Sequence, residues 1–346
     1  MTAHLGFASQ SAANTRSAAI ATEQSCGDGV GDITTRFFET VNYPTASDWA
    51  LRVIESQTWV LTATEQGNLI YPRTLIVAAD GSGDYTTVGA ALAASAADDR
   101  IQIKNGTYAP SYVSGSGYFV ISKALTIEAY PGHAPVLTYR GTDKQNIFYI
   151  TADNVILRGL KIVGTYALGD SSAQTSNNIL IAGSATIDNC EIADFNHCGI
   201  KISNGRAIVK NCYVHHGGFN SQDHCIYYAS HVRGTPKFLS NELTGAAGWG
   251  LHLYNYEYDA TITSNNIHDN TNGGLLLTGE NHTVTGNTIA SNGVGGGIRY
   301  YHSATNLTVT GNTLSGNGTY DQLADFSAGE GFVNCTISGN SGTKNF

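Results

Sequence analysis

The sequence predicts an all-β fold in which short strands stack as the coils of a parallel β-helix solenoid. Five segments between residues 197 and 302 align with one another, and the first aliphatic residue of each recurs every 23 to 26 residues. Each anchor is followed two positions later by a second large residue, the alternation of a strand with one buried face. No apolar stripe with the 3.6-residue helical period accompanies the repeat, so helical repeats are excluded. The anchors are Ile200, Ile226, Leu251, Leu275 and Ile298.

A second column runs in step with the anchors, two residues before an aliphatic residue in each repeat. Asparagine amides in such a column can bond from coil to coil, and small cysteines can occupy the same interior position. Stacked coils are separated by about 4.8 Å, the spacing of neighbouring strands. The column contains Cys190, Cys212, Asn241, Asn265, Asn287, Asn312 and Cys335.

Composition supports one large domain with an exposed-strand surface. The chain has 346 residues with 40 Gly, only 6 Pro and 13% charged residues, so glycine belongs to turns and the surface is mostly uncharged. A net charge of −9 without a basic run argues against a nucleic-acid partner. No apolar run reaches the ~18 residues that would span a membrane.

The six cysteines leave two alternatives open. Cys190 and Cys212 are expected on neighbouring coils, as are Cys198 and Cys225. The thiols are either buried and free, or at least one pair forms a disulfide. No Cys/His spacing typical of a zinc site is present.

Residues 1–74 differ from the repeats and are expected to form an N-terminal arm. The first 30 or so are rich in Ala, Ser and Thr without periodicity, whereas 33–74 carry aromatic residues, so we expect the latter to pack irregularly on the solenoid domain, 75–346. The first residues lack the pattern of a secretory signal. We expect an extracellular protein, either secreted with its signal removed or part of a phage particle.

The solenoid is expected to begin at Leu75 with a strand, a glycine turn, a short helix and a second strand. Thr86 or Thr87 can cap the helix, and Val88 and Leu92 can face inward. Such a helix would cover the open end of the coil stack, which would otherwise expose apolar side chains and unpaired backbone groups.

This opening resembles the first coil of pectin-lyase-like β-helix proteins, a superfamily that includes pectin methylesterases, pectate lyases and sugar epimerases. The resemblance lies in VAADGSGDYTTVGAAL and IQIKNGTY, and the repeats from Leu157 to Ile337 resemble the generic repeat of the same superfamily. It implies a right-handed parallel β-helix. It does not select one activity, because the fold hosts lyases, hydrolases, esterases and inert structural proteins.

One outer face of the aligned strands collects residues suited to an acidic polysaccharide. The residues that follow the anchors should point outward within roughly 20 Å along the axis. Aromatic rings can stack on sugar rings, and cations can hold carboxylates. An exposed strand also favours such residues for its own sake. The face contains Lys201, Tyr227, His252, Leu276 and Arg299, together with Tyr254, two positions after His252, and Tyr301, two positions after Arg299.

These groups meet the needs of β-elimination on a uronate sugar. A cation must neutralise the carboxylate so that the weakly acidic neighbouring proton can leave, a base must remove that proton, and an acid must protonate the leaving oxygen. We assign His252 or Lys201 as the base, Tyr227 as the acid and Arg299 as the cation. Superfamily lyases resemble this set and sometimes use calcium, so calcium is a possible cofactor, whereas no other cofactor and no metal ligand are assigned.

Further residues beside this face are expected to bind substrate. These are Tyr254, Tyr301, His224, Asp223 and Trp249. His224 is either a structural histidine at a corner or one oriented by Asp223. Gln222-Asp223-His224 matches the methylesterase segment only in part, and the next coil supplies no second Asp, so an esterase is not expected.

Other functions remain open alternatives. Glu191 and Glu242 are expected two coils apart on one column, roughly 9–10 Å, close to the separation of an inverting hydrolase pair. A uronate epimerase would use the same face. A phage tailspike or other glycan-binding stalk would be a homotrimer, whereas a secreted lyase would be a monomer.

Overall fold

The computed structural model describes residues 72–110, 118–138, 146–166, 176–229, 234–254, 258–326 and 330–346, together with two short strands near the N-terminus. The chain divides into two units, Met1–Arg73 and Thr74–Phe346. In the first unit β1 (Thr62–Ala63) pairs antiparallel with β2 (Leu69–Ile70). The predicted packing of the aromatic arm lies outside the described residues, as does Cys26.

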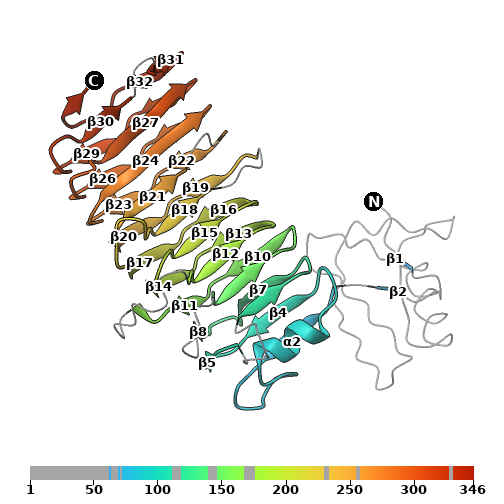
Figure 1. Cartoon of the computed structure of the whole chain (residues 1–346). Helices are drawn as coiled ribbons and strands as arrows, with labels where there is room; N and C mark the ends of the chain where they lie inside the picture. The colour runs from blue at the N-terminus through green and yellow to red at the C-terminus, as the bar shows by residue number, and fades with distance from the viewer. Residues whose placement is uncertain are drawn as a thin grey trace, which may run out of the picture. The chain divides into compact units, whose positions relative to one another are not determined.

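The second unit is a solenoid whose coils each contribute strands to three parallel sheets (Figure 1). We call them the first, second and third sheet, in the order in which the chain meets them within a coil. The first sheet contains β3 (Thr74–Val77), β4 (Arg100–Ile103), β7 (Thr126–Ala129), β10 (Val155–Arg158), β13 (Ser184–Asp188), β16 (Arg206–Lys210), β19 (Lys237–Leu239), β22 (Thr261–Thr263), β25 (Thr283–Thr285), β28 (Thr308–Thr310) and β32 (Thr336–Ser338).

The second and third sheets run alongside with the same stacking order. The second contains β5 (Thr107–Tyr108), β8 (Val136–Thr138), β11 (Lys161–Val163), β14 (Glu191–Phe195), β17 (Tyr213–Gly217), β20 (Glu242–Ala246), β23 (Asn266–His268), β26 (Thr288–Ala290) and β29 (Thr313–Ser315). The third contains β6 (Phe119–Ile121), β9 (Phe148–Ile150), β12 (Ile179–Ile181), β15 (Ile200–Ile202), β18 (Ile226–Tyr228), β21 (Trp249–Leu253), β24 (Gly273–Glu280), β27 (Ile298–Thr305), β30 (Gln322–Asp325) and β33 (Lys344–Asn345), while β31 (Phe332–Val333) also pairs with β27.

The predicted helix exists and covers the first coil. Helix α2 (Val88–Ala94) begins after Thr87, whose side chain accepts a hydrogen bond from the Ala90 N–H at 3.2 Å. Val88 and Leu92 are buried, and the helix packs on β3, β4 and β6. It therefore covers the apolar interior at the N-terminal end of the stack, as the sequence predicts.

The anchors of the repeat line the interior of the third sheet in one continuous column. Ile200 pairs in register with Ile226, Ile226 with Leu251, Leu251 with Leu275, and Leu275 with Ile298. All five are fully buried. Burial of a Leu or Ile side chain contributes about 1.5–3 kcal/mol, so the column is a principal source of stability.

The predicted asparagine ladder forms at the corner between the first and second sheets. Each Nδ2 donates to the Oδ1 of the next asparagine at 2.8–3.0 Å and to a buried carbonyl, and each Oδ1 also accepts a backbone N–H. Buried polar groups are therefore satisfied along the stack. The ladder consists of Asn241, Asn265, Asn287, Asn312 and Asn340, and Cys190 and Cys212 occupy the equivalent place in earlier coils.

One predicted member of this column was wrong. Cys335 lies at the corner before the first sheet, where its sulfur accepts from the Leu307 N–H at 3.4 Å, and Asn340 takes the ladder position instead. The segments around Cys335 and Asn340 have similar sequences, so only the strand register shows which of the two lies in the ladder. Thr308 pairs with Thr336, which places Cys335 directly before the first-sheet strand. The five described cysteines are free thiols.

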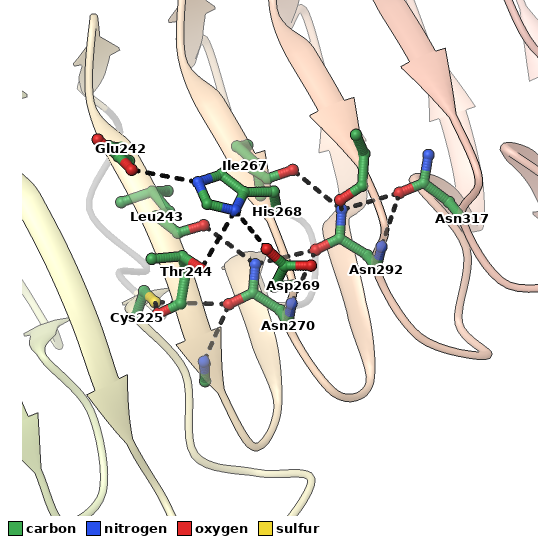
Figure 2. A network of polar contacts seen from close by, with 12 residues as sticks. Cys225, Glu242, Leu243, Thr244, Ile267, His268, Asp269, Asn270, Asn292 and Asn317 are labelled. Atoms are coloured by element: carbon green, nitrogen blue, oxygen red, sulfur yellow. Dashed lines mark hydrogen bonds and ion pairs between the residues drawn. The ribbon is translucent and has the colours of Figure 1, made fainter.

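A second ladder, which the sequence reading missed, follows the second sheet. Asn270 donates to Asn292 at 3.0 Å, and Asn292 to Asn317 at 2.8 Å (Figure 2). Asn317 in turn donates to the Asp321 carboxylate at 2.9 Å. An asparagine three residues after an interior Ile or Leu was the available signal. Two ladders at two corners fix the coil register where no strand hydrogen bonds exist.

Candidate functional site

The third sheet carries the predicted outward column in unbroken register. Lys201 pairs with Tyr227, Tyr227 with His252, His252 with Leu276, and Leu276 with Arg299. Their neighbours along each strand are buried anchors, so the column points outward from the interior. The sequence therefore predicted the register of this column correctly, although His252 and Leu276 are only 8% and 9% exposed. The chemical roles of its members are a separate question.

Three successive coils bring the first part of this face into a compact aromatic cluster. The Tyr227 ring centroid lies 5.0 Å from that of His252, 5.2 Å from that of His224 and 5.8 Å from that of Tyr254. The Lys201 Nζ lies 5.4 Å from the Tyr227 centroid, a cation–π distance. Among the described residues no carboxylate pairs with Lys201, so its charge is available to a ligand.

Two histidines in this cluster are joined by a chain of directed hydrogen bonds. The Trp249 backbone N–H donates to His224 Nδ1 at 3.0 Å, and His224 Nε2 lies 2.9 Å from His252 Nδ1. Burial, together with the charges of His197 and Lys201, lowers the pKa of His224 well below 6.5. Burial also lowers the pKa of His252 to about 4. Both imidazoles are therefore neutral at neutral pH.

Close approach of the next coil to His224 depends on Gly248. A Cβ placed on Gly248 would lie 2.5 Å from His224 Nδ1 and 2.5 Å from the Asp223 carbonyl oxygen. Any side chain at this position would displace the histidine that Trp249 contacts. The backbone of β21 can therefore reach His224 only because residue 248 is glycine.

Asp223 is fully engaged below the surface and does not face a ligand. Its Oδ1 lies 2.6 Å from His197 Nδ1, and its Oδ2 accepts the Phe219 and Asn220 N–H groups at 2.7 and 2.9 Å. Burial lowers the pKa of His197, but contacts with Asp223 and Cys198 more than offset this and raise it to about 9. The partner of Asp223 is thus His197, not the adjacent His224, and the predicted substrate contact of Asp223 does not fit this burial.

The predicted aromatic residues divide between exposed and buried positions. Tyr254 and Tyr301 are 40% and 37% exposed, so each offers a ring face to a ligand. Trp249 is only 4% exposed, because its indole lies over the α-carbons of Gly273 and Gly295. Its predicted role as a sugar-stacking residue therefore does not fit the structure, and the glycines of the next two coils were the sequence signal for that packing.

Arg299 lies two coils beyond His252, roughly 10 Å along the axis, and already has an acidic partner. Its guanidinium forms an ion pair with Asp325, while its Cζ lies 5.9 Å from the Tyr301 ring centroid. The sequence reading missed Asp325, because the pairing follows from the register of β27 with β30. Arg299 and Tyr301 thus form a separate group from the Lys201–Tyr227–His252 cluster.

The carboxylates considered for hydrolysis lie on the second sheet. Glu191 and Glu242 face Tyr213 from either side, in the predicted column. Glu191 contacts Lys161 at 2.7 Å and His215 at 3.3 Å, and Glu242 contacts His268 at 3.2 Å. Burial raises the pKa of Glu191, but its contacts with Lys161 and His215 outweigh this and lower it overall. A general acid needs the opposite shift, so this pair is poorly suited to hydrolysis.

Two hollows on the described surface lie away from the aromatic cluster. One of about 310 Å³ and another of about 440 Å³ are lined by Ser184 and Arg206, the first residues of β13 and β16 in the first sheet. A polymer chain that binds along an open sheet needs no enclosed cavity, so this mismatch does not argue against the third-sheet face.

Neither a metal cluster nor a membrane helix was found in the described part of the chain. No group of three or more His, Cys, Asp or Glu side chains is placed to hold a metal ion there. The described helix is also too short to cross a membrane. Calcium takes six to eight oxygen ligands, and near the outward column Asp325 is already paired with Arg299. These residues do not fit a calcium site, and no step below depends on one.

Comparison with known proteins places the fold. A family model described as a right handed beta helix region matches residues 142–320. The Dettilon tailspike protein (gp208) superimposes with a TM-score of 0.54 at 16% identity, over 77% of this chain and 62% of that chain. Pectate lyase Pel9A gives a TM-score of 0.44 at 14% identity, over 78% of each chain.

A further solved structure is similar in the same way. The A-module of the Azotobacter vinelandii mannuronan C-5 epimerase AlgE4 gives a TM-score of 0.48 at 12% identity, over 75% of this chain and 91% of that chain. A search of the curated proteins finds no match. At such identities the likeness to solved structures shows the fold alone.

Proposed function

The chain belongs to the family of right-handed β-helix regions, and we propose that it binds an acidic, uronate-containing polysaccharide along its third sheet and cleaves it by β-elimination. Such a polymer lies outside cells, so the proposal includes an extracellular location. The polysaccharide is the only partner that the proposal requires.

One observation carries this proposal: a cation without an acidic partner and three aromatic groups lie on one outer face of three successive coils. Lys201, Tyr227 and His252 come from β15, β18 and β21, and Tyr254 directly follows β21. The ring centroids of Tyr227, His252 and Tyr254 lie 5.0–5.9 Å apart. Rings of this kind present flat faces to sugars, and a cation without an acidic partner attracts an acidic polymer. Arg299 and Tyr301 extend the face for a sugar further along the polymer.

The reaction that these groups support is proton abstraction followed by loss of a glycosidic oxygen. A base takes the proton next to the uronate carboxylate, the C–H electron pair forms a carbon–carbon double bond, and the C–O bond to the leaving sugar breaks. Tyr227 is proposed to give its proton to that oxygen. The sequence predicts His252 or Lys201 as the base. His252 would act through a free ring nitrogen, with Lys201 as the cation beside the carboxylate. Lys201 would act only after releasing the proton that makes it a cation, so the carboxylate would then be held by hydrogen-bond donors of this face.

Activity tests this directly. Pectate, alginate, hyaluronan and bacterial capsules are offered separately, and ultraviolet absorbance of the unsaturated uronate product is followed. Lys201→Met should abolish the signal, whereas Lys237→Met, an exposed lysine on the first sheet, should leave it unchanged. An equal loss in both variants, or an unchanged rate in Lys201→Met, would contradict the assignment of this face.

Glycan binding without cleavage is the second candidate, favoured by the ion pair of Arg299 with Asp325. This pair leaves one unpaired cation on the described part of the face, which is enough for recognition but less than carboxylate neutralisation and proton removal together demand. A tailspike-like stalk should be a homotrimer and a secreted lyase a monomer, so mass in solution separates them. An epimerase would use the same groups and would invert the uronate without releasing an unsaturated product.

A further inference from the structure

The histidine pair of the aromatic cluster allows only one arrangement of protons. His224 Nδ1 accepts the Trp249 backbone N–H at 3.0 Å, so this nitrogen carries no hydrogen. A neutral imidazole must then carry its proton on Nε2, the other nitrogen. That N–H points at His252 Nδ1, 2.9 Å away, which must accept it. The single proton of neutral His252 therefore lies on its Nε2.

Other proton arrangements conflict with these contacts. If His252 Nδ1 donated instead, His224 would accept at both nitrogens and carry no proton, which a neutral imidazole cannot do. An imidazolium at either residue would set two N–H groups against each other. The neighbourhood also disfavours charge, since His197 and Lys201 are cationic and burial is nearly complete.

We propose that His224 is a positioning residue that fixes His252 in the Nε2–H form, so that His252 donates a hydrogen bond to an oxygen of the bound acidic sugar and cannot remove its proton. Among the described residues none accepts a hydrogen bond from His252 Nε2. The side chain lies on the outward column beside Tyr227 and Tyr254. Of the two predicted bases only Lys201 then remains, and it would first have to release the proton that makes it a cation. The role toward the sugar rests on the proposed function, whereas the tautomer does not.

The tautomer can be measured without any substrate. Protein labelled with ¹⁵N-histidine is studied by long-range ¹H–¹⁵N correlation at neutral pH, with His252→Gln and His224→Gln used to assign the signals. The expected pattern is an unprotonated Nδ1 and a protonated Nε2 at both residues. A protonated Nδ1 on His252, or an imidazolium, would overturn the proposal.

Two variants of His224 test whether it does the positioning. His224→Gln can accept from Trp249 and donate to His252, so His252 should keep the Nε2–H form. His224→Leu can do neither, so His252 should become a mixture of tautomers. The matched control is His282→Gln. This buried histidine lies in the next coil and is bonded to the Ala260 N–H and the Thr278 carbonyl, not to His224 or His252, so the signals of His252 should be unchanged. An unaltered His252 pattern in His224→Leu would remove the positioning role.

Failure of the proposed function would look different. If the wild-type protein neither binds nor cleaves any uronate polymer while His252 shows the Nε2–H pattern, the lyase proposal and the donor role toward sugar fail and the positioning by His224 stands. If cleavage is found, turnover should fall about tenfold in His224→Leu and be largely restored in His224→Gln, while the KM changes little. Equal loss in both variants would mean that His224 is only structural.

Discussion

Two buried histidines, His224 and His282, make the same kind of hydrogen bond at Nδ1 and different ones at Nε2. Each accepts a backbone N–H at Nδ1, from Trp249 at 3.0 Å and from Ala260 at 3.1 Å. His282 passes its Nε2–H to the Thr278 carbonyl at 2.8 Å, so its hydrogen bonds start and stop in the backbone. His224 instead donates its Nε2–H to Nδ1 of His252, a residue of the outward column.

The same local arrangement, a histidine that accepts a backbone N–H at Nδ1, therefore supports the backbone in one coil and a candidate site in another. Burial lowers the pKa of His282 and of His252 alike to about 4, so protonation state does not separate them. The two histidines differ in where their hydrogen bonds end. Those of His282 end at the Thr278 carbonyl, whereas those of His224 end at His252 on the outward column. The predictions that follow test this contrast.

The largest loss of stability is expected at His282, whose hydrogen bonds both end in the backbone. His282→Leu removes partners from the buried Ala260 N–H and Thr278 carbonyl, and each unsatisfied buried group costs about 1–3 kcal/mol. We expect the free energy of unfolding to fall by about 2–4 kcal/mol, measured by denaturant titration. His224→Leu removes the acceptor of the Trp249 N–H and the donor to His252 Nδ1. Because His252 is less completely buried than Thr278, the loss should be smaller than in His282→Leu, and a larger loss would contradict the comparison.

The second effect concerns the group that faces outward. His252→Leu should lower turnover on the cleaved polymer about 100-fold, the usual cost of removing one donor from a developing charge. His252→Gln keeps an N–H donor and should retain turnover within about tenfold. If His252 were the base, glutamine and leucine would be equally inactive.

A third test uses pH, because folding raises the pKa of His197 but lowers the pKa values of His252 and His282. Stability should therefore decline toward both alkaline and acid pH. The pKa of His197 is raised to about 9 in the folded protein, so its contribution is complete below about pH 6.5 and is lost as pH rises toward 9. The pKa values of His252 and His282 are lowered to about 4, so their contributions are complete above about pH 6.5 and are lost as pH falls toward 4. Stability should peak near pH 6.5.

His197→Gln isolates one limb of that profile. The alkaline decline, about 3 kcal/mol for a pKa raised from 6.5 to about 9 in a mostly buried group, should disappear while the acid decline remains. Denaturant midpoints at several pH values measure both. An unchanged alkaline limb would show that the His197–Asp223 contact is not its source.

The smallest effect is expected at the exposed counterpart of these buried groups. His268 lies between Asp269, at 2.8 Å, and Glu242, at 3.2 Å, on the outside of the second sheet (Figure 2). Burial lowers its pKa, but the two carboxylates outweigh this and raise it overall, so the contact stabilises at low pH and weakens as pH rises through that raised value. His268→Gln should change the free energy of unfolding by less than about 1 kcal/mol. A loss as large as that of His282→Leu would contradict the assigned difference between solvated and buried contacts.

The sequence by itself determined the coils, the interior columns and the outer face. A repeat near 24 residues and period-two alternation decide which side chains lie inside, because a strand allows only two sides. Ile226 and Leu251 therefore point into the interior, while Tyr227 and His252 lie on the opposite side of their strands, where His252 is still only 8% exposed. The helix at the N-terminal end followed from its cap and its apolar residues.

Only the tertiary structure decided which groups on that face meet and in what chemical state. The partners of Arg299 and His197 come from neighbouring coils, and Cys335 left its predicted column through strand register. The state of His252 depends on the Trp249 backbone N–H of its own strand, which reaches His224 on the preceding coil because Gly248 has no side chain. Alternation fixes the side of a sheet, but proton position depends on hydrogen-bond direction, which exists only once the coils are stacked.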